Sequence, residues 1–157
     1  MAIRQIVTVG DDVLRKKSFE VTDFGEKTHQ LLDDMYDTLV KADGAGLAAV
    51  QVGVLRRIFL VIKGDSVKDG VYEVINPEII SQSGTQYGVE GCLSVTNKWG
   101  DVERPYKVTL KYQDRYGKPQ KLKAEGFLAK AICHEYDHLN GTLYIDKADN
   151  IREKQWE

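Results

Sequence analysis

Hydrophobic residues recur at helical spacing in one segment of the first third of the chain. Residues three or four positions apart share one face of a helix, and five hydrophobic residues follow this spacing: Leu31, Leu32, Met35, Leu39 and Val40. Asp23, followed three residues later by Glu26, resembles a capping box at the start of such a helix. The pattern predicts an amphipathic helix from about Phe24 to Asp43, ending near Gly44.

A second helix is predicted from Glu125 to Asn140. The same spacing returns there in a second set of hydrophobic residues: Phe127, Leu128, Ala131, Ile132 and Leu139. Gly141 follows directly, and glycine readily takes the left-handed conformation that ends helices. The last segment, 147–157, mixes charges of both signs and predicts a short terminal helix held only by Ile151 and Trp156.

Between the helices, short segments rich in β-branched and aromatic residues predict strands. They are Arg57–Lys63, Tyr72–Asn76 and Lys107–Asp114. The turn Asp114-Arg115-Tyr116-Gly117 separates the last of these from a further predicted strand, Gln120–Ala124, and the two strands predict a hairpin. Because strands and helices are segregated along the chain, the predicted fold class is α+β rather than an alternating parallel sheet. No repeat or flexible linker interrupts the chain, so residues 1–157 are expected to form one domain.

The charge balance and the cysteine content narrow the function classes. The chain of 157 residues has 22 Lys and Arg against 24 Asp and Glu, without a run of like charge, so neither direct nucleic-acid binding nor a membrane partner is expected. The longest apolar run, Ile58–Ile62, is far short of the roughly 20 residues that span a bilayer. Asp11 and Asp12 precede any signal-like apolar stretch, which predicts a cytoplasmic protein whose two cysteines are thiols.

The second predicted helix contains His134-Glu135-Tyr136-Asp137-His138. Histidines four positions apart project from one helix face toward a single point, which suits a metal ion. Glu135, next to the first histidine, can act as a proton acceptor for water at that ion. The alternative is a charged helix face whose histidines are solvated.

A catalytic metal site of this kind usually has three protein ligands, so a third ligand must come from elsewhere. The metzincin pattern fails, because Tyr144 stands where its third histidine belongs. Glu153 has no long helix to position it, and His29 continues the apolar stripe of the first helix, so neither is expected to bind metal.

Cys92 is the better third ligand. It lies in the turn-like segment Glu90-Gly91-Cys92-Leu93-Ser94, where glycine permits close backbone approach, and a thiolate binds divalent metals strongly. A free cysteine is more often a small buried hydrophobic residue, and Cys133 is expected to be one.

The segment Gly44-Ala45-Gly46-Leu47-Ala48-Ala49-Val50-Gln51 formally matches a dinucleotide-binding fingerprint. That fingerprint requires a strand before it and a helix after it, whereas a predicted helix precedes this segment and a strand follows. Two interpretations stay open. The segment is either a helix end followed by small residues for tight packing, or a place where Gly46 approaches a substrate and Gln51 supplies an amide donor for an oxyanion.

Taken in order, GAGLAAVQ, EGCLS and HEYDH resemble the three sequence motifs of the peptide deformylases. The flanking segments Ile75-Asn76-Pro77-Glu78 and Leu139-Asn140-Gly141 are similar as well, so the resemblance spans nearly the whole chain. It implies antiparallel β-sheets packed around a central helix that carries the H-E-x-x-H motif. It also implies a metal-dependent hydrolase that removes the N-formyl group from nascent polypeptides beginning with formyl-methionine and releases formate.

The resemblance assigns a role to each matching residue. Cys92, His134 and His138 bind the metal, and Glu135 is the acid/base. The Gln51 side chain and the backbone N–H of Leu93 stabilise the oxyanion. Two further assignments follow: Gly46 offers backbone contacts to the substrate, while Glu90 and Arg104 form a pair that supports the loop around Cys92.

The resemblance implies Fe²⁺ in the cell, although sulfur with two imidazoles also accepts Zn²⁺, Ni²⁺ or Co²⁺. Phe127 and Ala131 are candidate walls of an apolar slot for methionine, or ordinary core residues, and Trp99 covers either substrate or core. Because the long basic tail of some relatives is absent, any ribosome contact is expected to be weak or to use another face. The chain is expected to be a monomer. The rival functions are an H-E-x-x-H peptidase that cleaves internal bonds and a metal-binding module without turnover.

Overall fold

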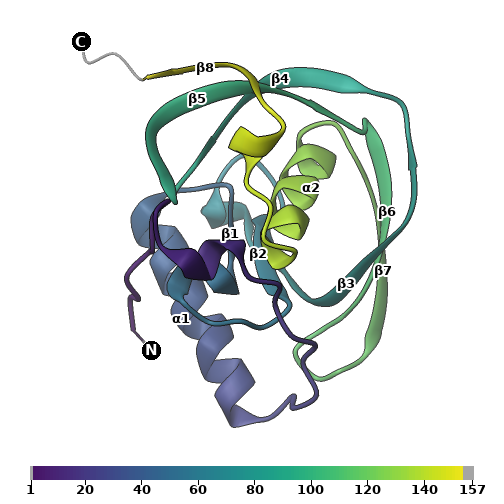
Figure 1. Cartoon of the computed structure of the whole chain (residues 1–157). Coiled ribbons are helices and arrows are strands. Elements are labelled where there is room, and N and C mark those ends of the chain that lie inside the picture. The colour runs from purple at the N-terminus through teal and green to yellow at the C-terminus, as the bar shows by residue number, and fades with distance from the viewer. Residues whose placement is uncertain (1, 154–157) are drawn as a thin grey trace.

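The computed structural model describes residues 2–153 of the chain (Figure 1). The helices are α1 (Glu26–Ala42) and α2 (Phe127–Leu139), with short 3₁₀ turns η1 (Asp12–Arg15), η2 (Ala49–Val52), η3 (Val67–Asp69) and η4 (Tyr144–Asp146). The strands are β1 (Gly46–Ala48), β2 (Ile58–Ile62), β3 (Val71–Ser83), β4 (Gln86–Cys92), β5 (Val95–Arg104), β6 (Lys107–Gln113), β7 (Pro119–Glu125) and β8 (Asp149–Glu153).

Helix α1 forms where its hydrophobic spacing predicts, and its apolar stripe is buried. Its start differs from the prediction, because Gly25 is the N-cap and no capping box forms. The Asp23 carboxylate instead accepts the backbone N–H of Gly25 at 2.9 Å, which turns the chain before the helix begins. At the other end Asp43 adopts the left-handed conformation, so the helix stops before Gly44.

In the described chain, five strands form an antiparallel sheet in the order β1-β2-β3-β6-β7. The predicted β6–β7 hairpin is confirmed, with Lys107 opposite Glu125 at its open end. Strand β3 runs on to Ser83, beyond the predicted end at Asn76, because its second half pairs with β6 although its side chains are mostly polar.

Three further strands of residues 2–153 form an antiparallel sheet in the order β4-β5-β8. Strands β4 and β5 are rich in glycine and polar residues, and no strand pattern predicted them. The predicted terminal helix is wrong over its described part, because Asp149–Glu153 pairs with β5 as β8. Ile151 lies in that strand, and Trp156 lies outside the described residues.

The two helices lie on opposite faces of the five-stranded sheet. On one face, α1 packs through Leu32, Met35 and Leu39 against residues that include Leu60 and Ile75. On the other face, α2 packs on a buried cluster that includes the following sheet residues: Phe59, Val61, Val74, Val108 and Leu110. The second sheet runs across the top of the molecule in Figure 1, with α2 beneath it. The predicted α+β class with antiparallel sheets is confirmed.

None of the helices in residues 2–153 is both long enough and apolar enough to span a membrane.

Candidate active site

Helix α2 presents the two histidines and the glutamate to the interior. His134, Glu135 and His138 are 9%, 4% and 1% exposed. Because the histidines are one helical turn apart, their rings meet edge to face with centroids 5.1 Å apart. The interpretation of these residues as a solvated surface is therefore wrong.

Strand β4 brings Cys92 to the same point. Cys92 is the last residue of β4, and the chain turns through Leu93 and Ser94 before β5 begins. The Cys92 Sγ lies 3.4 Å from His138 Nε2, and the ligand atoms of Cys92, His134 and His138 all lie within 4.8 Å of one another. The structure therefore gathers the three predicted metal ligands, which are 46 residues apart at their extremes.

The donor set fits a divalent metal ion. The Glu90 carboxylate accepts the Nδ1–H of His134 at 2.8 Å, which leaves the Nε2 of that ring for a metal. Burial opposes a charged His134, but hydrogen bonds with Cys92 and Glu90 raise its pKa to about 10. Cys92 and Glu90 thus stabilise positive charge at this ring. Burial and the charge of His134 lower the pKa of His138, which keeps that imidazole in its neutral, metal-binding form.

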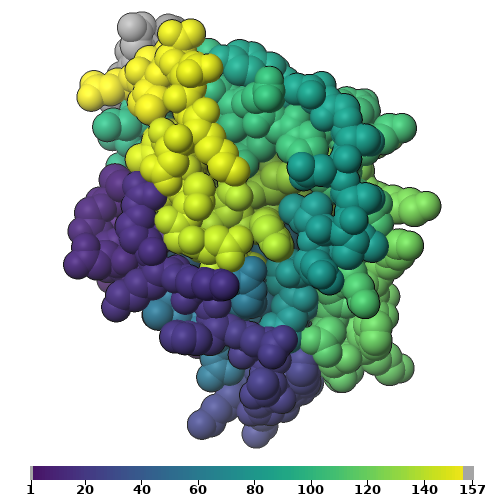
Figure 2. All heavy atoms as spheres, turned by 45° about the vertical axis from the view of Figure 1, so that its right-hand side comes forward, coloured from purple at the N-terminus to yellow at the C-terminus, as the bar shows by residue number. Residues whose placement is uncertain are grey.

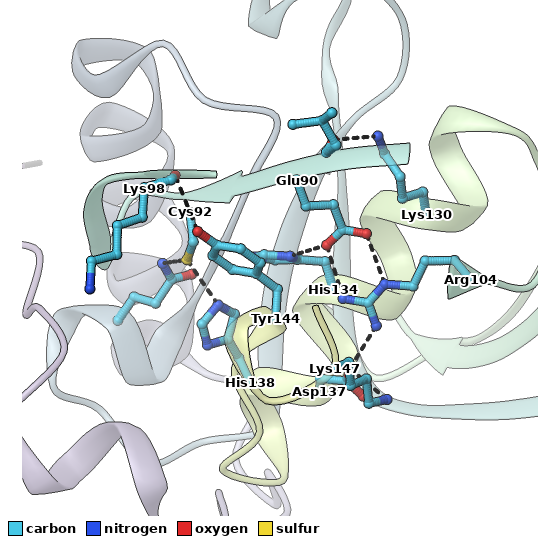
Figure 3. A network of polar contacts seen from close by, with 12 residues as sticks. Glu90, Cys92, Lys98, Arg104, Lys130, His134, Asp137, His138, Tyr144 and Lys147 are labelled. Atoms are coloured by element: carbon cyan, nitrogen blue, oxygen red, sulfur yellow. Dashed lines mark hydrogen bonds and ion pairs between the residues drawn. The ribbon is translucent and has the colours of Figure 1, made fainter. Parts of the chain in front are cut away.

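Glu90 belongs to a buried ionic network (Figure 3). Its two oxygens accept hydrogen bonds from Nε and one terminal nitrogen of Arg104, both at 2.9 Å. The expected pair is therefore present, and it acts on His134 as well as on the loop. Burial raises the pKa of Glu90, but the bonds from His134 and Arg104 outweigh it and lower the pKa to about 2.

The network extends to two residues that the sequence reasoning gave no role. Arg104 also donates to Asp137 at 2.7 Å, and Lys147 lies 2.9 Å from the same carboxylate oxygen. Asp137 follows His134 by three positions on α2, so helical spacing was the signal that could have found it.

Tyr144 is a further residue that sequence reasoning missed as a supporting group. Its buried ring stacks on His134 with an angle of 26° between the planes, and its hydroxyl donates to the Lys98 carbonyl at 3.1 Å. It thus connects the His134 ring to strand β5 (Figure 3). In the sequence, Tyr144 was noted only because it stands where the metzincin pattern has its third histidine.

Glu135 faces a cavity of about 360 Å³ beside the three ligands. The cavity is lined by residues from β1, η2, β4 and α2, among them Gly46, Gln51, Cys92, Leu93 and His134. Burial raises the pKa of Glu135 to about 7. Its buried Oε1 has no hydrogen-bond partner among the described residues, so one carboxylate oxygen is available to a water molecule.

Gly46 permits Glu135 to reach this place. A Cβ atom at Gly46 would lie 2.8 Å from Glu135 Oε2 and 2.9 Å from the Leu60 carbonyl, closer than side chains tolerate. Gly46 is the first residue of β1, at an outer edge of the five-stranded sheet, so its backbone borders the cavity. This close packing fits the first interpretation of the segment, small residues for tight packing, and the approach of Gly46 to a substrate stays a prediction.

Gln51 is held beside the cysteine by three polar contacts. Its Oε1 accepts the N–H of Ala48 at 2.9 Å, and its Nε2 donates to Ser94 Oγ at 3.1 Å and toward Cys92 Sγ at 3.6 Å. Because both ends of the amide are engaged, its donor points toward the metal cluster. Leu93, the other predicted oxyanion donor, lines the same cavity.

The remaining sequence candidates are also located. Phe127, Ala131 and Trp99 all line the cavity, as wall residues would. His29 lies on α1 and its Nε2 is 2.8 Å from the Arg115 carbonyl, outside this site. Cys133 is buried, and burial raises its pKa to about 11, as expected for an unreactive core thiol.

A family model described as polypeptide deformylase matches residues 3–154. The chain belongs to this family. It is 54% identical to the peptide deformylase of Caldicellulosiruptor bescii over 147 residues, which cover 94% of this chain and 86% of the relative. The crystal structure of a peptide deformylase from Legionella pneumophila is similar with a TM-score of 0.89 and 42% identity, over 95% of this chain and 88% of that one. The peptide deformylase of Thermotoga maritima is similar with a TM-score of 0.89 and 38% identity, over 95% of this chain and 99% of that one.

Proposed function

We propose that this deformylase-family chain is a metal-dependent hydrolase that removes the N-formyl group from the formyl-methionine at the start of nascent polypeptides. Water is consumed, and formate and a free N-terminal amine are released. One observation carries the proposal: Cys92, His134 and His138 converge beside a cavity and a buried Glu135 oxygen that has no hydrogen-bond partner in residues 2–153. The membership of the deformylase family supports the same conclusion.

Cys92, His134 and His138 would hold one divalent metal ion, with Fe²⁺ as the ion in the cell and Zn²⁺, Ni²⁺ or Co²⁺ as alternatives. When bound, such an ion supplies a Lewis acid that polarises the formyl carbonyl and makes water more acidic. Thiolate sulfur and imidazole nitrogen suit all four ions; the general affinity order favours Zn²⁺ over Fe²⁺, and Fe²⁺ as the ion in the cell rests on the resemblance to the family. Glu90, supported by Arg104, orients the His134 ring toward this ion.

The chain's own groups would carry the proton and charge transfers. Glu135 accepts a proton from the attacking water and delivers it to the departing amine, and a raised pKa of about 7 matches both steps. The Gln51 amide and the backbone N–H of Leu93 donate to the oxygen on which negative charge collects. Gly46 offers backbone hydrogen bonds to the extended substrate at the edge of β1.

The wider assignments belong to the same proposal. The chain acts as one catalytic domain over residues 1–157, built around α2 as the central helix that carries the H-E-x-x-H motif. It works as a monomer in the cytoplasm, where nascent formyl-methionine chains are made. Any contact with the ribosome is weak.

Formate release from a formyl-Met tripeptide tests the activity. We expect anaerobically purified protein to release formate and to contain about one metal ion per chain. The same peptide with an acetyl group, and a peptide with only internal amide bonds, should remain intact. Cleavage of the internal bonds would instead indicate a peptidase.

Two cysteine variants separate the metal site from general damage. Cys92→Ala should lose both metal and turnover, whereas Cys133→Ala, which removes a buried thiol outside the cluster, should keep both. Bound metal without formate release in the unmodified protein would overturn the proposed function.

A further inference from the structure

The positive charge of this chain is concentrated in the β6–β7 hairpin. Residues 107–125 contain six Lys and Arg against two Asp and Glu, a formal charge of +4, whereas the whole chain carries −2 and the remainder therefore −6. No run of adjacent basic residues reveals this, because the lysines alternate with other residues along both strands. Alternate residues of a strand share one face of the sheet.

The strand register places four lysines on one face. Lys107 and Lys111 of β6 share that face with Lys121 and Lys123 of β7, and all four are exposed. The other face of the hairpin carries Val108, Leu110 and Ala124, which are buried in the core beneath α2. We call the exposed side the lysine face, defined by residues 107, 111, 121 and 123.

No other element of residues 2–153 forms a layer over the lysine face. Helix α1 is on that side of the sheet, but its core cluster involves β1, β2 and the first half of β3. Figure 2 shows the hairpin, in green, at the right-hand edge of the molecule with side chains projecting outward. The lysine face is therefore accessible to a partner.

The arrangement of these lysines costs stability. Lys111 stands directly opposite Lys121, and like charges at such positions destabilise a sheet. Among the described residues neither they nor Lys123 has an ion pair; Glu78 is opposite Lys111 on β3 without pairing to it, and Lys107 and Glu125 are 3.9 Å apart. An anionic partner would relieve this repulsion.

Protection of a sheet edge explains only part of the pattern. Lysines on an exposed edge strand discourage pairing with another chain, which suffices for β7. Strand β6 lies between β3 and β7 and has no free edge, yet it carries Lys107 and Lys111 on the same face.

We propose that the lysine face binds the phosphate backbone of RNA. This inference rests on the proposed function, because a nascent polypeptide is delivered by the ribosome, whose surface is largely RNA. Phosphate contacts by lysines are independent of base sequence and weaken steeply with salt. At its open end the hairpin is connected through Gly126 to Phe127, which lines the catalytic cavity.

This proposal replaces the expectation that the chain has no nucleic-acid partner. That expectation was drawn from the absence of a run of like charge along the sequence, whereas the lysine face is formed by alternate residues of two paired strands. A face of four lysines predicts a weak contact, in agreement with the expected weak association with the ribosome.

Binding of the full-length protein to a labelled 24-nucleotide RNA stem-loop tests the proposal. We expect the affinity to fall about 100-fold between 50 and 200 mM salt, as for roughly four neutralised phosphates. The variant Lys111→Gln/Lys121→Gln/Lys123→Gln should bind at least 10-fold more weakly. The variant Lys16→Gln/Lys17→Gln/Lys27→Gln removes the same charge from other exposed positions and should stay within about 2-fold of the unmodified protein.

Deformylation of two substrates distinguishes this proposal from the proposed function. The hairpin variant should process a formyl-Met tripeptide at the normal rate but a ribosome-bound formyl-Met chain more slowly. If the unmodified protein releases no formate from the tripeptide, the proposed function fails. If tripeptide turnover is normal while the two triple variants bind RNA with the same affinity, the proposed RNA binding by the lysine face is wrong and the proposed function stands.

Two other results would also overturn the RNA assignment. Binding to phosphatidylserine vesicles without binding to the stem-loop would identify a membrane surface as the partner. The hairpin variant could instead self-associate while its monomer binds RNA with unchanged affinity. The role of the lysines would then be to prevent the β7 edge from pairing with another chain.

Discussion

Glu90 shows at the residue scale how one side chain serves both stability and the metal site. Its carboxylate joins the ring of His134 to the guanidinium of Arg104, and all three groups are buried. A buried charge is stable only while its partner is present. The orientation of a metal ligand likewise depends on the group that holds its other ring nitrogen.

Replacing Glu90 should therefore damage two properties at once. We expect Glu90→Gln to lower the free energy of unfolding of the metal-free protein by about 3 kcal/mol, because Arg104 loses its main counter-charge. Metal affinity should fall roughly 10- to 100-fold. Urea unfolding and competition with a chelator measure the two effects. Glu125→Gln, at an exposed and distant pair with Lys107, is the control and should change neither.

Glu135 should affect chemistry without affecting the metal. Glu135→Gln keeps the size of the side chain but cannot accept the proton, so formate release should fall by roughly 1000-fold. Metal content, measured on the same sample, should be unchanged because Glu135 is outside the cluster of three ligand atoms. Loss of metal in proportion to activity would contradict the role of proton acceptor.

At the scale of elements, the end of α2 is packed against the N-terminal part of the chain. Gly141 follows the helix with a φ of +78°, and a Cβ atom there would overlap the carbonyl of Arg15 in η1. The N–H of Ser18 also donates to the carbonyl of Leu139 at 2.8 Å. Thus the glycine permits both the turn and this contact.

A pair of glycine variants separates these two effects. Gly53 has a φ of +82°, but no atom of the part of the chain that the structure describes lies within 4 Å of an added Cβ atom. Gly53→Ala should cost only the backbone strain, about 1 kcal/mol. Gly141→Ala adds the clash with Arg15 and should cost roughly 3 kcal/mol or more, measured by urea unfolding. Equal losses of unfolding free energy in the two variants would show that Arg15 moves away from the added Cβ atom at little cost.

The N-terminal segment is attached to α1 through Asp34. The carboxylate accepts the N–H of Ala2 at 2.8 Å and the Nε–H of Arg4 at 3.0 Å. Burial raises the pKa of Asp34, but hydrogen bonds from Gln30, Arg4 and Ala2 outweigh it and lower the pKa below its usual value. The stabilisation is then fully present above the ordinary Asp pKa of about 3.9 and is lost as the pH falls through the lower folded value.

Asp34→Asn should therefore flatten the acid side of the stability profile. We expect the free energy of unfolding to depend less steeply on pH between about 5 and 2 than in the unmodified protein. Asp37→Asn removes an acid from the same helix without removing a hydrogen bond or ion pair seen in residues 2–153, so it is the matched control. Thermal unfolding across this pH range gives the comparison, and identical profiles for the two variants would refute the linkage.

At the scale of the whole molecule, the candidate metal site joins the second sheet to the helix that packs on the first sheet. Cys92 ends β4 of the second sheet, while His134 and His138 belong to the helix packed on the first sheet. A ligand that binds only the folded state stabilises it by mass action, by about 2.7 kcal/mol at a concentration of 100 times Kd. Metal loss should therefore lower the free energy of unfolding of the whole domain and not only disturb the cavity.

Chelation measures this contribution. We expect removal of the metal to lower Tm by roughly 5 to 10 °C for a chain of this size. The melting temperature of Cys92→Ala should not respond to the chelator, because that variant lacks a ligand. A chelator effect of equal size in both proteins would show that the stabilising ion binds elsewhere.

Much of this protein was determined by its sequence because the deciding interactions are local. Hydrophobic spacing predicted α1 and α2, since a helix buries one stripe that repeats every three to four residues. The residue types of Lys107–Asp114 and the turn that follows them predicted the β6–β7 hairpin. The distance between His134 and His138 followed from the helical repeat alone, and the resemblance to the deformylase family supplied Cys92, Gln51 and Leu93 as their companions.

Only the tertiary structure decided what depends on contacts between distant segments. Strands β4 and β5 carry little hydrophobic alternation, and β8 is exposed throughout, so their pairing with one another defines them. Cys92 approaches His138 across 46 residues. A series of ion pairs runs from Glu90 through Arg104 and Asp137 to Lys147, which are also distant in sequence. The lysine face is formed by residues that alternate along two strands. Local propensity contains no information about such juxtapositions, because the free energy that fixes them comes from packing and charge pairing in the assembled fold.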